Sequence, residues 1–225
     1  EMNAYLVTSI INLDCDYKSR IKRIKFEEDS AVRTIYGRSF SSSDIEEIHF
    51  PKSLVELKEG WCYNTKKLTK IIISPSNGKF MLKDDSYLLG KSDPNNEFDI
   101  LFFANRKINE ISIPSNIKII SSYAFYFCQY LSKVEIPTNS NLQIIERDAF
   151  SFSDIEKIFI PPSVTKICRY AFSYCNNLIK VEIPKNSNLQ TIEKDAFSNS
   201  YIEEIFIPPN VTKISENAFN NCKHL

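Results

Sequence analysis

Residues 155–177 read IEKIFIPPSVTKICRYAFSYCNN, and residues 178–201 repeat the same pattern as LIKVEIPKNSNLQTIEKDAFSNSY. Each unit opens with alternating apolar residues that end at a proline, continues with a second apolar pair and closes on Ala-Phe. Such alternation is typical of a strand with one buried face, and proline ends the strand because it has no amide hydrogen to donate. The pattern therefore predicts two short strands and a turn in every unit.

The unit recurs along most of the chain. Copies begin near residues 21, 45, 68, 108, 131, 155, 178 and 202. One unit cannot bury its own apolar side chains, whereas stacked units bury them in a continuous core. We therefore predict a repeat solenoid, mainly β, of about eight 23/24-residue coils with parallel β-ladders and short 3₁₀ turns. Ile158, Phe172 and Ile205 are expected in its core.

Two segments depart from the repeat. Residues 1–20 hold only a degenerate copy and are expected to form an N-terminal coil or cap, while residues 21–225 form the solenoid. The unit at 108 begins 40 residues after the unit at 68, and two mainly apolar runs there, 87–89 and 99–104, flank a polar turn. We expect a hairpin-like insertion at about 76–107 that extends from the edge of the stack. Leu225 matches the first residue of a unit, so we expect the C-terminus to be cut at the start of a further repeat.

Composition and charge argue against several partners. The 28 basic and 28 acidic side chains cancel, so no net field draws the chain to nucleic acid or to an anionic membrane. No apolar run approaches the ~18 residues of a membrane helix, so no membrane insertion is expected for this chain. An apolar fraction of 43% supports a packed core.

The unit L/I-x-x-I/V-x-I-P, followed by V-T-K-I and A-F-x-x-C, resembles the BspA-type leucine-rich repeat, also called leucine-rich repeat type 5. The copies at 178–197 and 202–222 are especially similar to it. The resemblance implies a right-handed solenoid that binds host proteins, matrix or other cells, without catalysis. Proteins with this repeat occur on the surface of mucosal bacteria and parasitic protists, so it also implies a location at the cell surface or outside the cell.

The sequence contains no recognisable catalytic constellation, and no cofactor or metal is expected. It lacks the nucleophile elbow, the P-loop, the dinucleotide-binding fingerprint and the zinc-protease motif. The two histidines, His49 and His224, fall at opposite ends of the predicted stack. A carbohydrate-processing enzyme or lectin would need paired carboxylates facing one groove, and Glu135 and Glu182 are separated by the Phe159 rung. We therefore expect the chain not to be an enzyme.

Three cysteines follow the repeat. Cys128, Cys175 and Cys222 recur every 47 residues, which corresponds to two coils. Equivalent residues two rungs apart lie about 10 Å from each other, and a disulfide needs Cα atoms within about 7 Å. We expect reduced, buried thiols that pack as small apolar groups. The pairing of the others, Cys15, Cys62 and Cys168, does not follow from the sequence.

One row of strand side chains must face solvent, and this row is the candidate surface for a partner. In the register of Phe159 it comprises Lys25, His49, Ile72, Ser112, Glu135, Phe159, Glu182 and Phe206. The neighbouring row adds Lys133, Lys157, Lys180 and Glu204. Exposed aromatic rings framed by charges are typical of interfaces. The alternative is that Phe159 and Phe206 pack against neighbouring rungs without any partner.

The sequence thus predicts a non-enzymatic protein-protein interaction solenoid, acting as a cell-surface adhesion or host-contact protein. Its expected partner is a host or matrix protein, or a second copy of the chain. The alternative is an intracellular leucine-rich-repeat scaffold in the cytoplasm that binds an endogenous protein. Asn210-Val211-Thr212 matches the N-glycosylation acceptor motif, so Asn210 is a possible glycosylation site, although the tripeptide also fits a simple turn.

Overall fold

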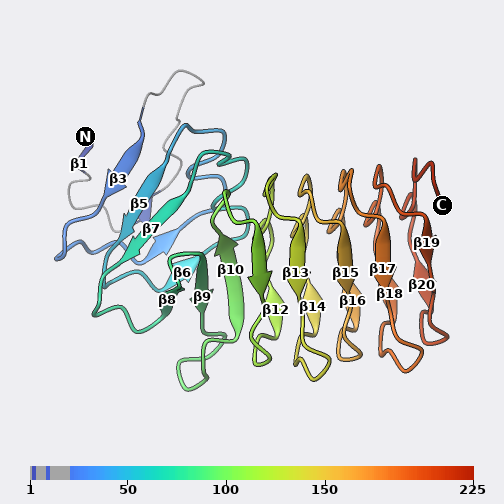
Figure 1. The fold of residues 1–225 in the computed structure, drawn as a ribbon. Helices are drawn as coiled ribbons and strands as arrows, with labels where there is room; N and C mark the ends of the chain where they lie inside the picture. Colours follow the sequence, from blue (N-terminus) through green and yellow to red (C-terminus); the bar gives the residue numbers. More distant parts are fainter. Residues whose placement is uncertain (1, 4–8, 11–20) are drawn as a thin grey trace.

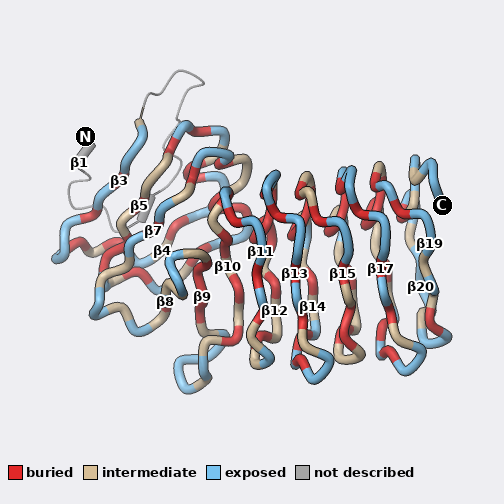
Figure 2. Tube along the Cα trace, in the orientation of Figure 1, coloured by how far each residue is buried: buried red, intermediate tan, exposed pale blue. Residues whose placement is uncertain are grey.

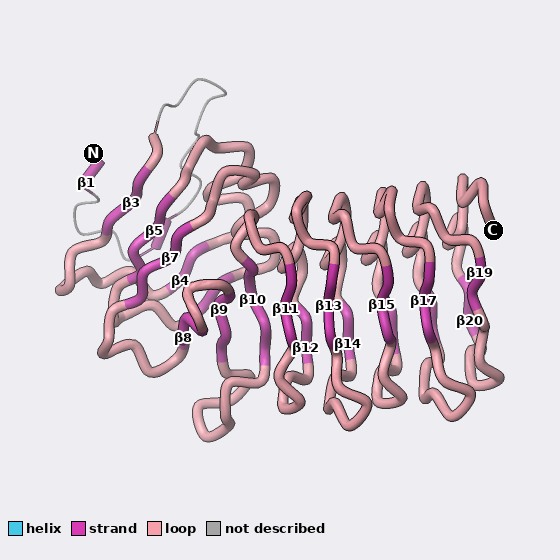
Figure 3. Tube along the Cα trace, viewed as in Figure 1, coloured by secondary structure: helices cyan, strands magenta, loops and turns pink. Residues whose placement is uncertain are grey.

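The computed structural model describes residues 2–3, 9–10 and 21–225 and shows a β-solenoid whose coils follow one another along one axis (Figure 1). The described residues form short strands joined by turns, and no helix occurs among them (Figure 3). Most of the predicted N-terminal cap, together with Cys15, lies outside the described residues. The structure is therefore mainly β, with parallel ladders between coils, as predicted.

The first strand of each unit belongs to the first wall of the solenoid. They are β1 (Met2–Asn3), β3 (Arg23–Lys25), β5 (Glu47–Phe50), β7 (Lys70–Ile73), β11 (Glu110–Ser112), β13 (Lys133–Glu135), β15 (Lys157–Phe159), β17 (Lys180–Glu182) and β19 (Glu204–Ile205). They pair in parallel as two separate sheets, in the orders β1-β3-β5-β7 and β11-β13-β15-β17-β19. Figure 1 shows the strands of the first sheet inclined to those of the second.

The second apolar pair of each unit forms the second wall. Its strands are β2 (Ser9–Ile10), β4 (Thr34–Ile35), β6 (Glu56–Leu57), β12 (Ile119–Ile120), β14 (Ile144–Ile145), β16 (Lys166–Ile167), β18 (Thr191–Ile192) and β20 (Lys213–Ile214). These strands are also parallel, with isoleucine facing isoleucine from coil to coil, as in the pairing of Ile145 with Ile167. Ile35, Ile120, Ile145, Ile167 and Ile192 therefore stack on the inside, whereas Ile214 of the last described coil is exposed. Along the tube, buried parts alternate with exposed ones (Figure 2).

The Ala-Phe segment forms a third wall made of turns rather than the predicted 3₁₀ turns. The amides of Tyr170, Phe172 and Tyr174 donate to carbonyls of the following coil at 2.7–3.3 Å, while the amides of Ala171 and Ser173 bond within their own coil. Tyr170 and Tyr174 have φ values of 59° and 57°. A 3₁₀ helix needs consecutive bonds within one coil at negative φ. The alternating geometry instead lets every second amide bond to the neighbouring coil.

The phenylalanines of the Ala-Phe pairs stack along the inside of this third wall. The rings of Phe125, Phe150, Phe172, Phe197 and Phe219 follow one another at centroid separations of 4.6–5.3 Å, with planes within 5°. Ile158 and Phe172 are fully buried, as predicted, but Ile205 is only partly buried. Ile205, which was also expected in the core, is less buried because it lies on β19, the edge strand of its sheet.

The insertion is built into the second wall, where we expected a hairpin extending from the edge of the stack. Strands β8 (Phe80–Lys83), β9 (Tyr87–Gly90) and β10 (Ile100–Ala104) form an antiparallel meander. The last of them, β10, pairs in parallel with β12 of the next coil. The meander interrupts the stack, so the apolar core consists of two clusters rather than one continuous core.

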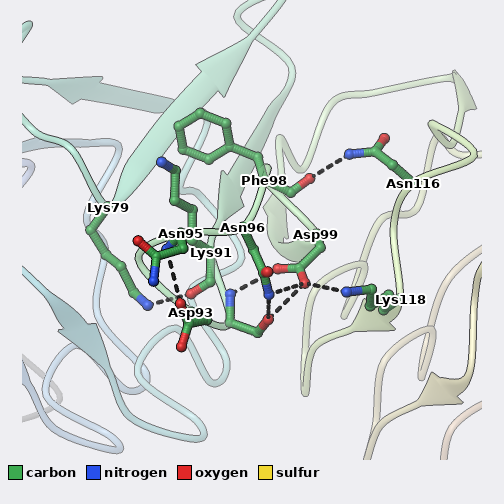
Figure 4. Close-up of polar contacts among 10 residues, drawn as sticks. Lys79, Lys91, Asp93, Asn95, Asn96, Phe98, Asp99, Asn116 and Lys118 are labelled. Atoms are coloured by element: carbon green, nitrogen blue, oxygen red, sulfur yellow. Dashed lines mark hydrogen bonds and ion pairs between the residues drawn. The ribbon is translucent and has the colours of Figure 1, made fainter.

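A buried carboxylate fastens the loop of the meander to the next coil. The Asp99 side chain is 3% exposed. It accepts hydrogen bonds from the Ser92 backbone amide at 2.7 Å, from the Ser92 hydroxyl at 2.6 Å and from the Asn96 side-chain amide at 3.3 Å. Nζ of Lys118, in the following coil, lies 3.2 Å from the same carboxylate (Figure 4). Asp99 therefore links the loop to the coil that carries β12.

Replacing Asp99 with asparagine is expected to lower the free energy of unfolding at neutral pH by about 1–3 kcal/mol. Burial alone would raise the pKa of Asp99, but the bonds from Ser92 and Lys118 outweigh it and hold the pKa below its usual value. A lowered folded pKa stabilises the protein above the unfolded pKa of about 3.9, and this contribution is lost as the pH falls. In urea unfolding, the difference in the free energy of unfolding between wild type and Asp99→Asn should therefore become smaller below about pH 4.

The matched control for this prediction is Asp93→Asn in the same loop. Asp93 is exposed, and its carboxylate accepts a hydrogen bond from the Asn95 amide within the loop. We expect its substitution to change stability by less than about 0.5 kcal/mol. If Asp99→Asn lowers the free energy of unfolding by the same amount at pH 7 and at pH 3, the ionised carboxylate does not stabilise the loop as we infer.

Candidate functional site: the exposed strand face

The structure places the predicted solvent-facing residues on adjacent rungs of the first wall. Lys25, His49 and Ile72 are paired neighbours in the first sheet. In the second sheet, Ser112 pairs with Glu135, and Phe159 with Glu182. The neighbouring row follows as Lys133, Lys157, Lys180 and Glu204. The predicted rows are thus present, but the insertion divides them between two sheets, so they do not form one unbroken surface.

The apolar members of this face differ in exposure. Phe206 is 45% exposed and Ile72 is 36% exposed, whereas Phe159 is half-buried. Phe206 directly follows β19, the edge strand of its sheet, and its exposed ring does not help to bury the core. Phe206 is accordingly the clearest candidate for an aromatic contact with a partner.

A groove crosses β15, β17 and β19 and brings Phe159 and Phe206 together. Its volume is about 620 Å³, and it is also lined by Ile179, Lys180, Val181, Glu182, Ile183, Pro184, Glu203 and Glu204. Five of the predicted residues therefore share this one feature: Phe159, Lys180, Glu182, Glu204 and Phe206. An apolar floor framed by charged side chains is the usual composition of a protein-binding surface.

Sequence reasoning missed Ile179, which is 40% exposed in this groove. It lies directly before β17, so the strict alternation of the strand does not decide where its side chain points. A signal was nonetheless present, because the equivalent positions of other units are polar, as at Ser132, Glu156 and Glu203. An isoleucine at a position that is otherwise polar indicates an apolar side chain left in water.

The charges on the strand face largely pair with one another. Lys133 lies 2.6 Å from Glu135, and Lys180 lies 2.8 Å from Glu182. In the first sheet, Glu47 contacts His49 and also Lys70, and the hydrogen bond with His49 is the main reason that the pKa of Glu47 lies below its usual value. Exposed pairs of this kind contribute little to stability. The groove itself is lined by one lysine and three glutamates (Lys180, Glu182, Glu203 and Glu204), so its rim has an excess of negative charge.

Ile72 belongs to a second, separate hollow beside the insertion. This hollow of about 390 Å³ is also lined by Met81 of β8 and by Phe98. Met81 is exposed to the same extent as Ile72. The insertion thus borders the strand face and adds apolar surface that the repeat itself does not supply.

The repeating cysteines occupy one column of the structure. Cys128 and Cys175 are buried and free, and Ser153 stands on the rung between them, 3.6 Å from the Cys175 sulfur. Cys222 is half-buried, which is less than predicted. Burial raises the pKa of Cys175 to about 12 and that of Cys62 to about 11. These thiols are therefore protonated at neutral pH and are poor nucleophiles.

Asn210 has a structural role in the turn between coils. Its side-chain amide nitrogen, the atom that would carry a glycan, donates a 2.7 Å hydrogen bond to the Ser187 carbonyl of the preceding coil. Ser163 makes the equivalent bond to the Ser140 carbonyl at 2.7 Å. The repetition of this contact supports the reading of the tripeptide as a turn, and glycosylation of Asn210 stays a prediction.

Residues 21–225 and the two short described strands before them contain no cluster of histidine, cysteine, aspartate and glutamate suited to a metal ion. In the same part of the chain, no helix has the length and apolar character needed to cross a bilayer.

The stacked coils, the parallel ladders and the repeated strand-turn unit define a leucine-rich-repeat protein. The chain belongs to the family of the BspA type leucine rich repeat region, whose model matches residues 7–83 and 97–225 in six copies. This family comprises repeat scaffolds associated with protein interaction. A search of curated proteins finds no match.

Solved structures of bacterial proteins share the fold. A leucine-rich repeat protein from Eubacterium ventriosum is 21% identical, with a TM-score of 0.58 over 89% of this chain and 65% of its own. The pneumococcal vaccine antigen PcpA is 22% identical, with a TM-score of 0.61 over 91% of this chain and 44% of its own. A leucine rich cell surface protein from Faecalibacterium prausnitzii is 19% identical, with a TM-score of 0.59 over 89% and 63%. The chain thus spans less than two thirds of each of these proteins.

Proposed function

We propose that this chain is a non-enzymatic interaction solenoid that acts at the cell surface or outside the cell, in adhesion or host contact. The groove across β15, β17 and β19 is the proposed docking surface for a protein partner. The observation that carries the proposal is that Phe206 and Ile179 are both exposed and line one groove together with Phe159. Large apolar side chains gathered in water have a free-energy cost that a partner removes by covering them.

The family and the structural relatives support the surface location. Two of the similar structures are described as a vaccine antigen and as a cell surface protein. Both have the same coil architecture, although their identity to this chain is about one fifth. A rigid row of strands gives such proteins a preformed binding surface, because the backbone does not have to be ordered when the partner binds.

The double variant Phe159→Ser and Phe206→Ser is expected to weaken partner binding by at least about tenfold, because exposed aromatic anchors dominate interface energetics. Its melting temperature should stay near that of wild type. Binding is measured to intact mammalian cells and to a panel of immobilised matrix proteins, and self-association is measured by sedimentation. The same groove residues should matter for whichever partner is found.

The matched control is Tyr130→Ser. Tyr130 is the most exposed large apolar side chain among the described residues, at 66%, and it lies outside the groove. Equal loss of binding in Tyr130→Ser and in the double variant would mean that the groove is not the docking surface. A collapse of stability in the double variant would assign the two rings to the core instead.

The alternative function is that of an intracellular scaffold with the same fold. It is distinguished by staining unpermeabilised producing cells with an antibody against the solenoid. Surface staining that is lost after brief protease treatment of intact cells is expected under our proposal. Staining only after permeabilisation would assign the protein to the cell interior.

A further inference from the structure

We propose that this chain carries a second binding site, for a pyranose ring of a neutral glycan, in a notch on the turn wall that Tyr174 and Tyr201 help to line. The notch has a volume of about 320 Å³ and shares no lining residue with the strand-face groove. The site is therefore independent of the proposed protein-binding function.

The notch exists because an aromatic column is interrupted. Every coil of the turn wall places a left-handed residue at the same position, and in successive coils these residues are Phe127, Phe152, Tyr174, Asn199 and Asn221. Phe152 and Tyr174 stack at 4.6 Å with planes within 4°. The next two rungs carry only asparagine, which is shorter than a ring. One face of Tyr174 is thus covered by Phe152, and the step down to Asn199 opens the space beside the ring.

A second aromatic ring, that of Tyr201, also lines the notch. The ring of Tyr201 stacks on His224 with a centroid separation of 3.7 Å, which fixes its orientation. Tyr174 and Tyr201 are 43% and 39% exposed. Two tyrosines that are each held by a stacking neighbour offer rigid ring faces at a small entropic cost on binding.

Side-chain amides also line the notch. Nδ2 of Asn221 donates to Oδ1 of Asn199 at 2.6 Å, and this bond holds both amides in place. It does not use Nδ2 of Asn199 or Oδ1 of Asn221, so a donor and an acceptor stand beside each other. Asn176 adds a third amide, and Lys223 adds a further donor. None of the lining residues carries a carboxylate.

These features match one class of ligand. A pyranose has a C–H face that packs on an aromatic ring and an edge of hydroxyls that both donate and accept hydrogen bonds. The notch has the corresponding ring faces and paired amide groups, and its volume is at the lower end of small-molecule sites. Since it is small and open, we expect a dissociation constant of about 1 mM for a single sugar.

The experiment is saturation-transfer NMR of the chain with methyl glycosides of galactose, glucose and N-acetylglucosamine at millimolar concentration. At least one of them should show transfer from the aromatic protons of the protein. Tyr174→Ala should reduce the affinity at least about tenfold, and Tyr130→Ala, at an exposed tyrosine outside the notch, should leave it unchanged. The double variant of Phe159 and Phe206 should also bind sugar normally, which separates this site from the strand face.

A second variant fills the notch without removing any existing stack. Asn199→Phe continues the aromatic column, and Phe127 and Phe152 already adopt the same backbone, with φ of 60° and 59° against 58° for Asn199. We expect this variant to keep or raise the melting temperature and to lose sugar binding. Wild-type binding of no neutral pyranoside, or undiminished binding by Asn199→Phe, would overturn the proposal. A sialoside and a proline-rich peptide are tested in the same way. A response confined to the sialoside would mean that Lys223 binds an anionic sugar there, and a response confined to the peptide would mean that the notch binds a protein partner. Either result would overturn the proposal.

Discussion

Phe172→Ala is expected to lower the free energy of unfolding by about 3–5 kcal/mol. The Phe172 ring is fully buried and is covered on both faces, by Phe150 at 5.1 Å and by Phe197 at 5.2 Å. Its removal leaves a cavity in the middle of the stack, and both neighbouring rings lose a stacking partner. In a solenoid each coil contacts only its neighbours, so the loss cannot be spread over a larger core.

The end of the same stack supplies the control. Phe219 is half-buried and stacks on one ring only, Phe197 at 5.3 Å. We expect Phe219→Ala to cost less than half as much as Phe172→Ala, and Phe172→Leu to recover part of the loss because it keeps much of the volume. Urea unfolding followed by circular dichroism measures all three variants. Equal costs for Phe172→Ala and Phe219→Ala would contradict the stacked core.

Arg106→Ala should also be strongly destabilising, by about 2–5 kcal/mol. Arg106 is 2% exposed where the two core clusters meet. Its guanidinium donates to the carbonyls of Ala124 at 2.9 Å and Tyr123 at 3.2 Å, and it lies 4.5 Å from the centre of the Phe103 ring. It also reaches the sulfurs of Cys62 and Cys128, both at 3.7 Å. Truncation would leave a cavity at the junction.

Two further variants separate the effect of the lost volume from the effect of the lost charge on the free energy of unfolding. Among the described residues, no carboxylate is paired with Arg106, so only the two carbonyls, the two sulfurs and the Phe103 ring offset the desolvation cost of the buried cation. The carbonyls of Tyr123 and Ala124 each accept a second hydrogen bond from a backbone amide, so they keep a partner when the guanidinium is removed. We therefore expect Arg106→Met, which fills the space without charge, to be the mildest change.

Arg106→Lys should be more destabilising than Arg106→Met, because an ammonium keeps the buried charge but cannot bridge the two carbonyls as the planar guanidinium does. The ranking by urea unfolding should be Met, then Lys, then Ala. A ranking in which lysine is tolerated and methionine is not would show that the charge itself stabilises the junction.

The sequence predicted the repeat, the strands and the register, and the reason is visible in the unit 155–177. Its alternation puts Ile158 inside and Lys157 and Phe159 outside, and a parallel ladder repeats that choice on each rung. The same logic placed Phe206, Glu182 and Lys180 together in the groove. A one-dimensional repeat leaves little freedom for any residue within an ordinary coil.

Features that depend on contacts between coils did not follow from the sequence. The left-handed turns at Tyr170 and Tyr174 carry no glycine signal, and they are adopted because inter-coil hydrogen bonds compensate for their backbone strain. The exposure of Ile179 depends on where β17 begins. These are local departures that only the neighbouring coils decide.

Sequence alone determined the solenoid, its coil length and the identity of its solvent-facing rows. A single coil cannot bury its repeated apolar side chains, whereas stacked coils bury all of them in the same way. Only the tertiary structure decided how the insertion joins the second wall, where Arg106 is buried and where the aromatic column stops beside Asn199. Those outcomes depend on contacts between coils, whose partners are 22 to 25 residues apart along the regular stack and 17 to 44 residues apart around Arg106.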